Sequence, residues 1–137
     1  ICIHSELQEL AEKAQQQLQN NTGLNLVIAA NYGGQWDITE AAKKIAAKAA
    51  KGEINPGSID NKVFSSHTAL SQYPLVDLLI RTSGEVRISN FLLWDIAYSE
   101  LYFCETLWPD FDANALDIAI KSFHSRNRRF GERNGEK

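Results

Sequence analysis

Residues 77–94 have the sequence DLLIRTSGEVRISNFLLW and combine the features of a strand, a turn and a helix start. The apolar run 76–80 is too short for a helix and is typical of a strand that is covered on both faces. Arg81 ends this run, and a glycine-containing turn follows it. Ser89 comes just before a second apolar run, where the N-cap of a helix is expected.

The polar residues of this stretch predict a binding site for a diphosphate group. An anion beside the expected helix start would meet free backbone N–H groups, the Ser89 hydroxyl and the guanidinium groups of Arg81 and Arg87. Ligands of α/β proteins bind at such strand-to-helix junctions. The competing interpretation is that the arginines form surface ion pairs and that Ser89 only caps a helix. The chain has no G-x-x-x-x-G-K-[ST] or G-x-G-x-x-G motif, so the arginines would hold the ligand.

Composition limits the kind of protein that the chain can form. It has 137 residues, of which 44% are hydrophobic and 23% charged, as expected for one soluble globular domain. A net charge of -3 gives no basic field, so nucleic acid is not expected as a partner. No apolar run has the length of a membrane span and no signal peptide is recognisable, which predicts a cytoplasmic protein. Cys2 and Cys104 lack metal-site spacing and are expected to be free thiols.

Hydrophobic periodicity predicts helices that alternate with apolar strands. Helices are expected at 5–18, at 38–49, after Ser89 toward Glu100, and at 113–123 behind an Asp112 N-cap, with a short helix within 59–70 and strands at 24–30, 76–80 and 101–104. This order predicts an α/β fold with a mainly parallel sheet flanked by helices. So few strands would leave a parallel sheet uncovered, and the chain begins with Ile1 and contains no methionine. We therefore expect the fold to be incomplete here because the N-terminal part of the domain is missing.

Several separated blocks resemble the C-terminal signature motifs of a known family. The blocks are residues 77–85, 87–94, 97–100 and 107–111, and residues 29–34 and 128–131 match as well. Over essentially its whole length the chain is similar to the cis-prenyltransferase family, in particular to the bacterial undecaprenyl diphosphate synthases. The resemblance implies that residues 1–137 are the C-terminal part of a single catalytic domain.

The resemblance implies a transferase that uses Mg²⁺. Such enzymes condense isopentenyl diphosphate with an allylic diphosphate, usually farnesyl diphosphate. Their product is a long-chain cis-polyprenyl diphosphate, here the undecaprenyl lipid carrier for cell-wall (peptidoglycan) synthesis, and this lipid would permit peripheral contact with a membrane. In the family, the residues that match Arg81, Arg87 and Ser89 hold the diphosphate of isopentenyl diphosphate. The strand-and-turn pattern points to the same three residues.

The resemblance also implies a homodimer whose subunits complete each other's sites. The family residue that matches Glu100 is tied to Mg²⁺, and those that match Arg129 and Gly131 reach the isopentenyl diphosphate of the neighbouring subunit. On a continuous helix, Glu100 would lie about 16 Å from Ser89. We therefore expect Glu100 to serve the site of the partner subunit.

The chain departs from the family pattern in three places. The N-terminal D-G-N-G-R block, whose aspartate positions magnesium and the allylic diphosphate, is absent. Most of the surface that forms the hydrophobic tunnel for the growing chain in the family is absent as well. Val86 stands where many bacterial members have histidine, and Asp95 stands where glutamine is usual. The fragment alone is therefore expected to be inactive.

Two alternatives stay open beside the enzyme. One is a non-catalytic partner subunit of a cis-prenyltransferase complex, and the other is a generic diphosphate-binding α/β domain. The complete set of anion ligands argues against the first, because a purely supporting subunit has no need of it. A trans-type prenyltransferase is disfavoured because the chain has no D-D-x-x-D motif.

Overall fold

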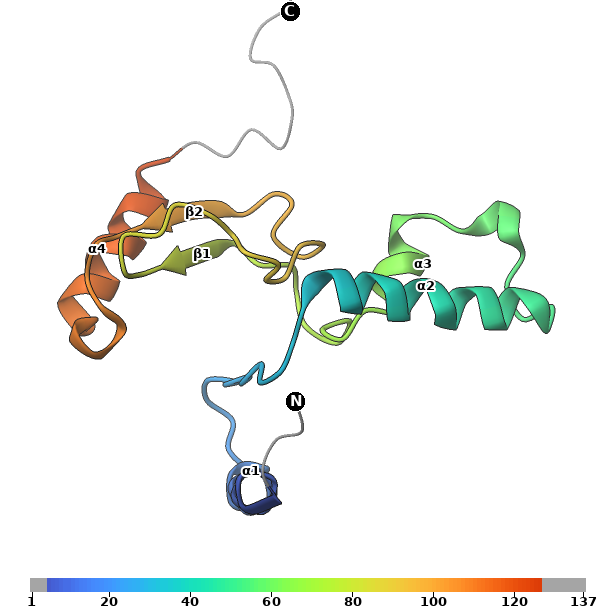
Figure 1. Ribbon diagram of the computed structural model, residues 1–137, viewed down its shortest axis with the longest axis horizontal. Helices are drawn as coiled ribbons and strands as arrows, with labels where there is room; N and C mark the ends of the chain where they lie inside the picture. Colours follow the sequence, from blue (N-terminus) through green and yellow to red (C-terminus); the bar gives the residue numbers. More distant parts are fainter. Residues whose placement is uncertain (1–4, 127–137) are drawn as a thin grey trace, which may run out of the picture. The chain divides into compact units, whose positions relative to one another are not determined.

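The structure, a computed structural model, describes residues 5–126 in two compact units, the first ending at Tyr32 and the second beginning at Gly33 (Figure 1). The elements are α1 (Ser5–Leu18), α2 (Gly34–Ala50), the 3-10 turn η1 (Pro56–Ser58), α3 (Asn61–Ser65), β1 (Leu78–Arg81), β2 (Glu100–Phe103), the 3-10 turn η2 (Trp108–Asp110) and α4 (Ala113–His124). Helices together with a parallel pair of strands confirm the predicted α/β class. Between residues 5 and 126, no helix combines the length and apolar character that a membrane span requires.

Among residues 5–32, the first unit contains one regular element. Helix α1 confirms the helix predicted at 5–18, although none of its described side chains is buried. The strand predicted at 24–30 is wrong, because these residues have no regular structure and Leu24 and Ile28 are largely exposed. A strand persists only when a neighbour completes its backbone hydrogen bonds. In the described part of the chain, the only sheet pairs β1 with β2 and leaves this segment without such a neighbour.

Helix α2 confirms the helix predicted at 38–49, although it begins four residues earlier, at Gly34, and ends one residue later. It follows a tight turn in which Asn31 has a φ angle of 56°. Ala41 and Ile45, one turn apart on this helix, are buried, whereas the neighbouring Ala42 and Ala46 are exposed. At its end the N–H of Lys51 donates to carbonyl oxygens of the last turn, and Gly52, with a φ of 75°, reverses the chain.

Strands β1 and β2 form a parallel sheet (Figure 1). The register runs from Leu78 opposite Glu100 to Arg81 opposite Phe103. Leu79 is buried, but the other residues of β1 are only half-buried. Both predicted strands therefore exist, although β1 is not covered on both faces.

Side-chain caps begin α3 and α4 as helix signals predict. Asp112 Oδ1 accepts a hydrogen bond from the Ala115 N–H at 2.9 Å, which confirms the predicted N-cap of α4. Asp60 Oδ1 accepts one from the Val63 N–H at 2.8 Å and caps the short connector helix α3. Helix α4 packs against β2 and buries Ala119 completely.

The long helix predicted after Ser89 is wrong. Residues 89–99 form a series of turns, in which Ser89, Asn90 and Leu92 have φ angles of 43°, 62° and 46°. Positive φ angles are incompatible with a right-handed helix, so Ser89 is not an N-cap. The apolar pattern still marks the core, because Leu92 and Ile96 are buried.

Asn90 explains why this segment does not continue as a helix. Its carbonyl oxygen accepts a hydrogen bond from the Gly34 N–H at 2.7 Å, and its Oδ1 accepts one from the Gln35 N–H at 2.8 Å. A helix N-terminus leaves such N–H groups without partners. The segment therefore serves the start of α2, and the close approach requires glycine, because a Cβ on Gly34 would lie 2.7 Å from Leu93 Cγ.

Candidate functional site

Arg81 and Ser89 come together at the carboxyl end of β1. Arg81 Nη1 donates hydrogen bonds to Ser89 Oγ at 2.8 Å and to the carbonyl oxygen of Arg87. The turn between them reverses the chain through Ser83 and Gly84, which both have a φ of 70°. The N–H groups of these two turn residues donate to carbonyl oxygens of the chain that follows β2. Local turn geometry and the end of the sheet thus place the Ser89 hydroxyl against the Arg81 guanidinium.

A cavity of about 280 Å³ opens beside this pair. It is lined by Leu79, Ile80, Arg81, Ile88, Ser89 and Phe91. Small-molecule sites have volumes of roughly 300–1,000 Å³, so this cavity is slightly smaller than a usual site. Its walls are apolar, and its polar lining residues are the hydrogen-bonded arginine and serine. Such a cavity suits a small ligand with an anionic head and a short apolar tail.

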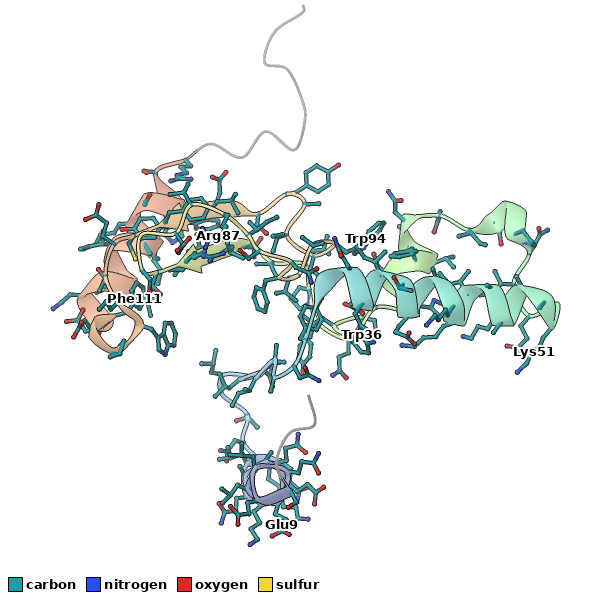
Figure 2. The ribbon with its side chains drawn as sticks, in the orientation of Figure 1. Glu9, Trp36, Lys51, Arg87, Trp94 and Phe111 are labelled. Atoms are coloured by element: carbon teal, nitrogen blue, oxygen red, sulfur yellow. The ribbon has the colours of Figure 1, made fainter. Side chains whose placement is uncertain are left out.

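Arg87 is placed differently from Arg81. Its side chain is 63% exposed, is not among the residues that line the cavity, and forms an ion pair with Glu85. Figure 2 labels Arg87 among the side chains around β1 and β2. Glu85 Oε2 also lies 4.0 Å from Arg81 Nη2. An incoming anion must therefore compete with Glu85 for both guanidinium groups.

The sequence prediction included Glu85 in its motif but gave this carboxylate no role. The sequence position of Glu85 indicates that it can pair with both arginines, because it lies four residues after Arg81 and two before Arg87. In a tight turn, an acid between two arginines is within reach of both. Asn90, which fixes the segment after Ser89, was missed as well, since its partners lie far away in the sequence.

Glu100 is not on a helix, so the expected helical separation from Ser89 is wrong. It begins β2 and stands opposite the first residue of β1, whereas Arg81 is the last. The two side chains therefore belong to opposite ends of the sheet, about 10 Å apart along the strands. Glu100 Oε2 forms an ion pair with Arg126 Nη1 at 3.1 Å. The structure does not bring Glu100 to the Arg81–Ser89 pair, and its service to a partner subunit stays a prediction.

The donors available for Mg²⁺ are few. Within residues 5–126, no group of three or more His, Cys, Asp or Glu side chains is placed to hold a metal ion. Glu100, the expected magnesium contact, already has a cationic partner. The described residues therefore do not form a self-contained magnesium site. Arg129 and Gly131, expected to reach a neighbouring subunit, lie outside the described residues.

Val86 and Asp95, the two single-residue departures from the family pattern, lie in different surroundings. Val86 is 74% exposed and is not among the lining residues of the cavity. Asp95 is only 7% exposed. Cys104 is a free thiol, as predicted, and Cys2 lies outside the described residues.

The chain belongs to the family described as putative undecaprenyl diphosphate synthase, which matches residues 2–131. It is 57% identical over 125 residues to a ditrans,polycis-undecaprenyl-diphosphate synthase ((2E,6E)-farnesyl-diphosphate specific) of Haemophilus influenzae, an alignment that covers 91% of this chain and 52% of that protein. A protein of the same description from Escherichia coli is 49% identical over 129 residues, with coverage of 94% and 51%. The chain thus spans about half the length of the curated relatives it matches.

Solved structures agree with this membership. Lavandulyl diphosphate synthase from Lavandula x intermedia, in complex with dimethylallyl diphosphate, superimposes with a TM-score of 0.90 at 41% identity over 95% of this chain and 56% of that one. A probable undecaprenyl diphosphate synthase from Campylobacter jejuni gives a TM-score of 0.78 at 28% identity, with coverage of 95% and 58%. The expected family is therefore confirmed.

Proposed function

We propose that this chain provides the isopentenyl diphosphate site of a cis-prenyltransferase of the undecaprenyl diphosphate synthase type. The observation that supports this most directly is the cavity beside β1, in which Arg81 and Ser89 stand against apolar walls. A diphosphate offers oxygen atoms that match the guanidinium fork and the hydroxyl. A five-carbon tail matches the apolar part of the cavity in polarity. The similarity to farnesyl-diphosphate-specific undecaprenyl diphosphate synthases supports the same assignment.

In the proposed complex, Arg81 anchors the diphosphate and the Ser89 hydroxyl donates a hydrogen bond to it. Ser89 can do so while it accepts from Arg81, because a hydroxyl both donates and accepts. Arg87 turns from Glu85 to the ligand. Anchoring the diphosphate holds the double bond of isopentenyl diphosphate in place for condensation, so the contribution of these residues to the rate is positional. Condensation joins the five-carbon unit to the allylic chain and releases a diphosphate and a proton.

The proposal extends to the whole enzyme. Farnesyl diphosphate is the proposed allylic substrate, and undecaprenyl diphosphate, a lipid carrier for peptidoglycan synthesis, is the proposed product. Mg²⁺ is the proposed cofactor, with Glu100 as its candidate ligand on this chain. We also propose a cytoplasmic homodimer that touches membranes peripherally through its product, with Arg129 and Gly131 at the partner's site. Residues 1–137 would be the C-terminal part of one catalytic domain and would be inactive alone.

Calorimetric titration of the chain with isopentenyl diphosphate and with inorganic diphosphate tests the proposed site. Isopentenyl diphosphate is expected to bind more tightly, because burying its apolar tail contributes on the order of 2 kcal/mol, or roughly thirtyfold in Kd. Equal affinities would favour the generic diphosphate-binding domain. If neither ligand bound, the site would be refuted and the non-catalytic partner subunit would be favoured.

Glu85→Gln is expected to tighten the binding of inorganic diphosphate. The substitution removes the carboxylate that competes for Arg81 and Arg87, and because this ion pair is largely exposed the gain is about two- to fivefold. Titration calorimetry at low salt measures it. Glu40→Gln is the matched control, since it removes the same charge from an exposed pair with Lys43. Weaker binding by Glu85→Gln would instead show that Glu85 orients the arginines.

A further inference from the structure

Two carboxyl groups are buried in the joint between α2 and the turns of residues 89–99. Asp37 is 3% exposed and Asp95 is 7% exposed. Asp37 Oδ1 accepts a hydrogen bond from the Ala69 N–H at 2.8 Å. Asp95 Oδ2 is buried and has no hydrogen-bond partner among the described residues. A negative charge on this oxygen is costly, because burial removes its water and nothing described replaces it.

The surroundings of Asp95 favour its neutral form. Burial raises the pKa of the Asp95 carboxyl, the negative charge of Asp37 raises it further, and a hydrogen bond to the backbone of Asp95 opposes them. Of the other ionisable groups nearby, Lys44 Nζ donates to the carbonyl oxygen of His67 and Lys43 pairs with Glu40, whereas His67 Nε2 is, like Asp95 Oδ2, buried without a hydrogen-bond partner among the described residues. His67 Nδ1 in turn contacts the α3 backbone. The carboxyl of Asp95 thus keeps its proton to a higher pH than an exposed aspartate does.

The segment that contains Asp95 also places Ser89. Asn90 is bound to the first N–H groups of α2, and Leu93 packs on Gly34. The carbonyl oxygen of Asp95 accepts a hydrogen bond from the Val76 N–H at 3.3 Å, just before β1. Contacts to α2 and to Val76, just before β1, therefore fix the position of residues 89–95. This segment begins with Ser89, the hydrogen-bond partner of Arg81.

We propose that Asp95 is a positioning residue that acts in its protonated form, holding residues 89–95 against α2 so that Ser89 meets Arg81. Ionisation of Asp95 puts a second negative charge beside Asp37 and loosens this joint. Anion binding at the Arg81–Ser89 cavity therefore weakens as the pH rises. This proposal rests on the proposed diphosphate site and adds a pH dependence to it.

The sign for stability follows from the same shift. Because the pKa of Asp95 is raised in the folded chain, the folded state binds more protons than the unfolded state at pH values between the unfolded and folded pKa. The stability contributed by this carboxyl is full below that window and falls as the pH rises through it. Asp95→Asn, which keeps the shape and has no charge to expose, is expected to lack this fall.

The test compares the wild-type chain with Asp95→Asn, and with Asp117→Asn as a control on the exposed face of α4. Inorganic diphosphate is titrated by calorimetry over a series of pH values. As the pH rises through the range between the unfolded and folded pKa of Asp95, the affinity of the wild type is expected to fall relative to that of Asp95→Asn by on the order of fivefold. A change of this size is typical of coupling between neighbouring residues. Asp117→Asn is expected to follow the wild type. Asp95→Gln, which introduces a second neutral side chain, is expected to behave like Asp95→Asn.

A second readout needs no ligand. Trp94 adjoins Asp95, its Nε1 donates to Ser65 Oγ at 2.8 Å, and Figure 2 shows it toward the N-terminal end of α2. With Trp36 and Trp108 replaced by phenylalanine, its fluorescence is expected to titrate with pH in the wild-type background and not in Asp95→Asn.

The outcomes separate the two proposals. Identical pH profiles of diphosphate affinity for the wild type and Asp95→Asn, or a Trp94 signal that titrates equally in both, would overturn the positioning role of Asp95 alone. Absence of diphosphate binding at every pH in both proteins would overturn the proposed site and the positioning role with it.

Discussion

Arg81→Ala is expected to weaken the binding of isopentenyl diphosphate by roughly thirtyfold, or about 2 kcal/mol, the amount that a hydrogen bond to a charged group contributes. Arg81 is the cationic residue that lines the cavity, and its side chain is less exposed than that of Arg87. Solvent screens its charge less, so the loss exceeds that expected for Arg87→Ala. Titration calorimetry of both variants at one salt concentration measures the difference.

Three controls make this result specific. Arg81→Lys keeps the positive charge but loses the bidentate hydrogen-bond donor of the guanidinium group. Its affinity for isopentenyl diphosphate is expected to lie between those of the wild type and Arg81→Ala. Lys43→Ala removes a positive charge from the exposed face of α2 and is expected to leave the affinity unchanged. Because Arg81 also bonds to Ser89, thermal unfolding of each variant shows whether the loop is still folded. If Lys43→Ala lost as much affinity as Arg81→Ala, the effect of Arg81→Ala would come from the net charge and not from a specific contact with the ligand.

Local signals predicted the parts of the fold whose partners are close in sequence. Asp112 caps α4 within three residues, and the buried stripe of α2 repeats every turn. The segment 24–30 failed because a strand is defined by a partner, and apolar composition does not supply one. The helix after Ser89 failed because Asn90 bonds to residues about 55 positions earlier. In both cases a nonlocal requirement overrode a local preference.

With the exception of Glu85, the site residues, too, were predicted where their contacts are local and missed where they are not. Arg81 and Ser89 meet because one turn connects them, and a turn containing glycine is recognisable from sequence. The ion pairs of Glu85 with Arg81 and Arg87 were not predicted although Glu85 lies in that turn, because the residue pattern that indicates an anion site is set by the arginines and is the same with or without a neighbouring acid. Glu100 was placed on a helix, whereas it begins β2, and the error followed directly from the wrong helix. The buried pair of carboxyls has no local sequence signature.

Gly34→Ala is expected to destabilise the second unit by about 1–2 kcal/mol, although it places a better helix former in α2. An added Cβ would lie 2.7 Å from Leu93 Cγ and 3.0 Å from the Leu93 backbone nitrogen. The backbone nitrogen cannot move away by a change of rotamer, as the end of a side chain can. Overpacking costs about 1–3 kcal/mol, which exceeds the gain of up to about 1 kcal/mol in helix propensity. For a unit of this size, the midpoint of thermal unfolding should fall by roughly 4–12 °C.

Gly34→Ala is also expected to weaken diphosphate binding at the Arg81–Ser89 site. Displacing Leu93 strains the hydrogen bonds of Asn90 to the first turn of α2, and Asn90 directly follows the Arg81 ligand Ser89. Weaker diphosphate binding should therefore accompany the lower stability. Gly23→Ala is the matched control, since a Cβ added at Gly23 would meet no atom within 4 Å, and it should change neither property. If Gly34→Ala lowered stability and left diphosphate affinity intact, Ser89 would be held by its own turn and not by the joint with α2.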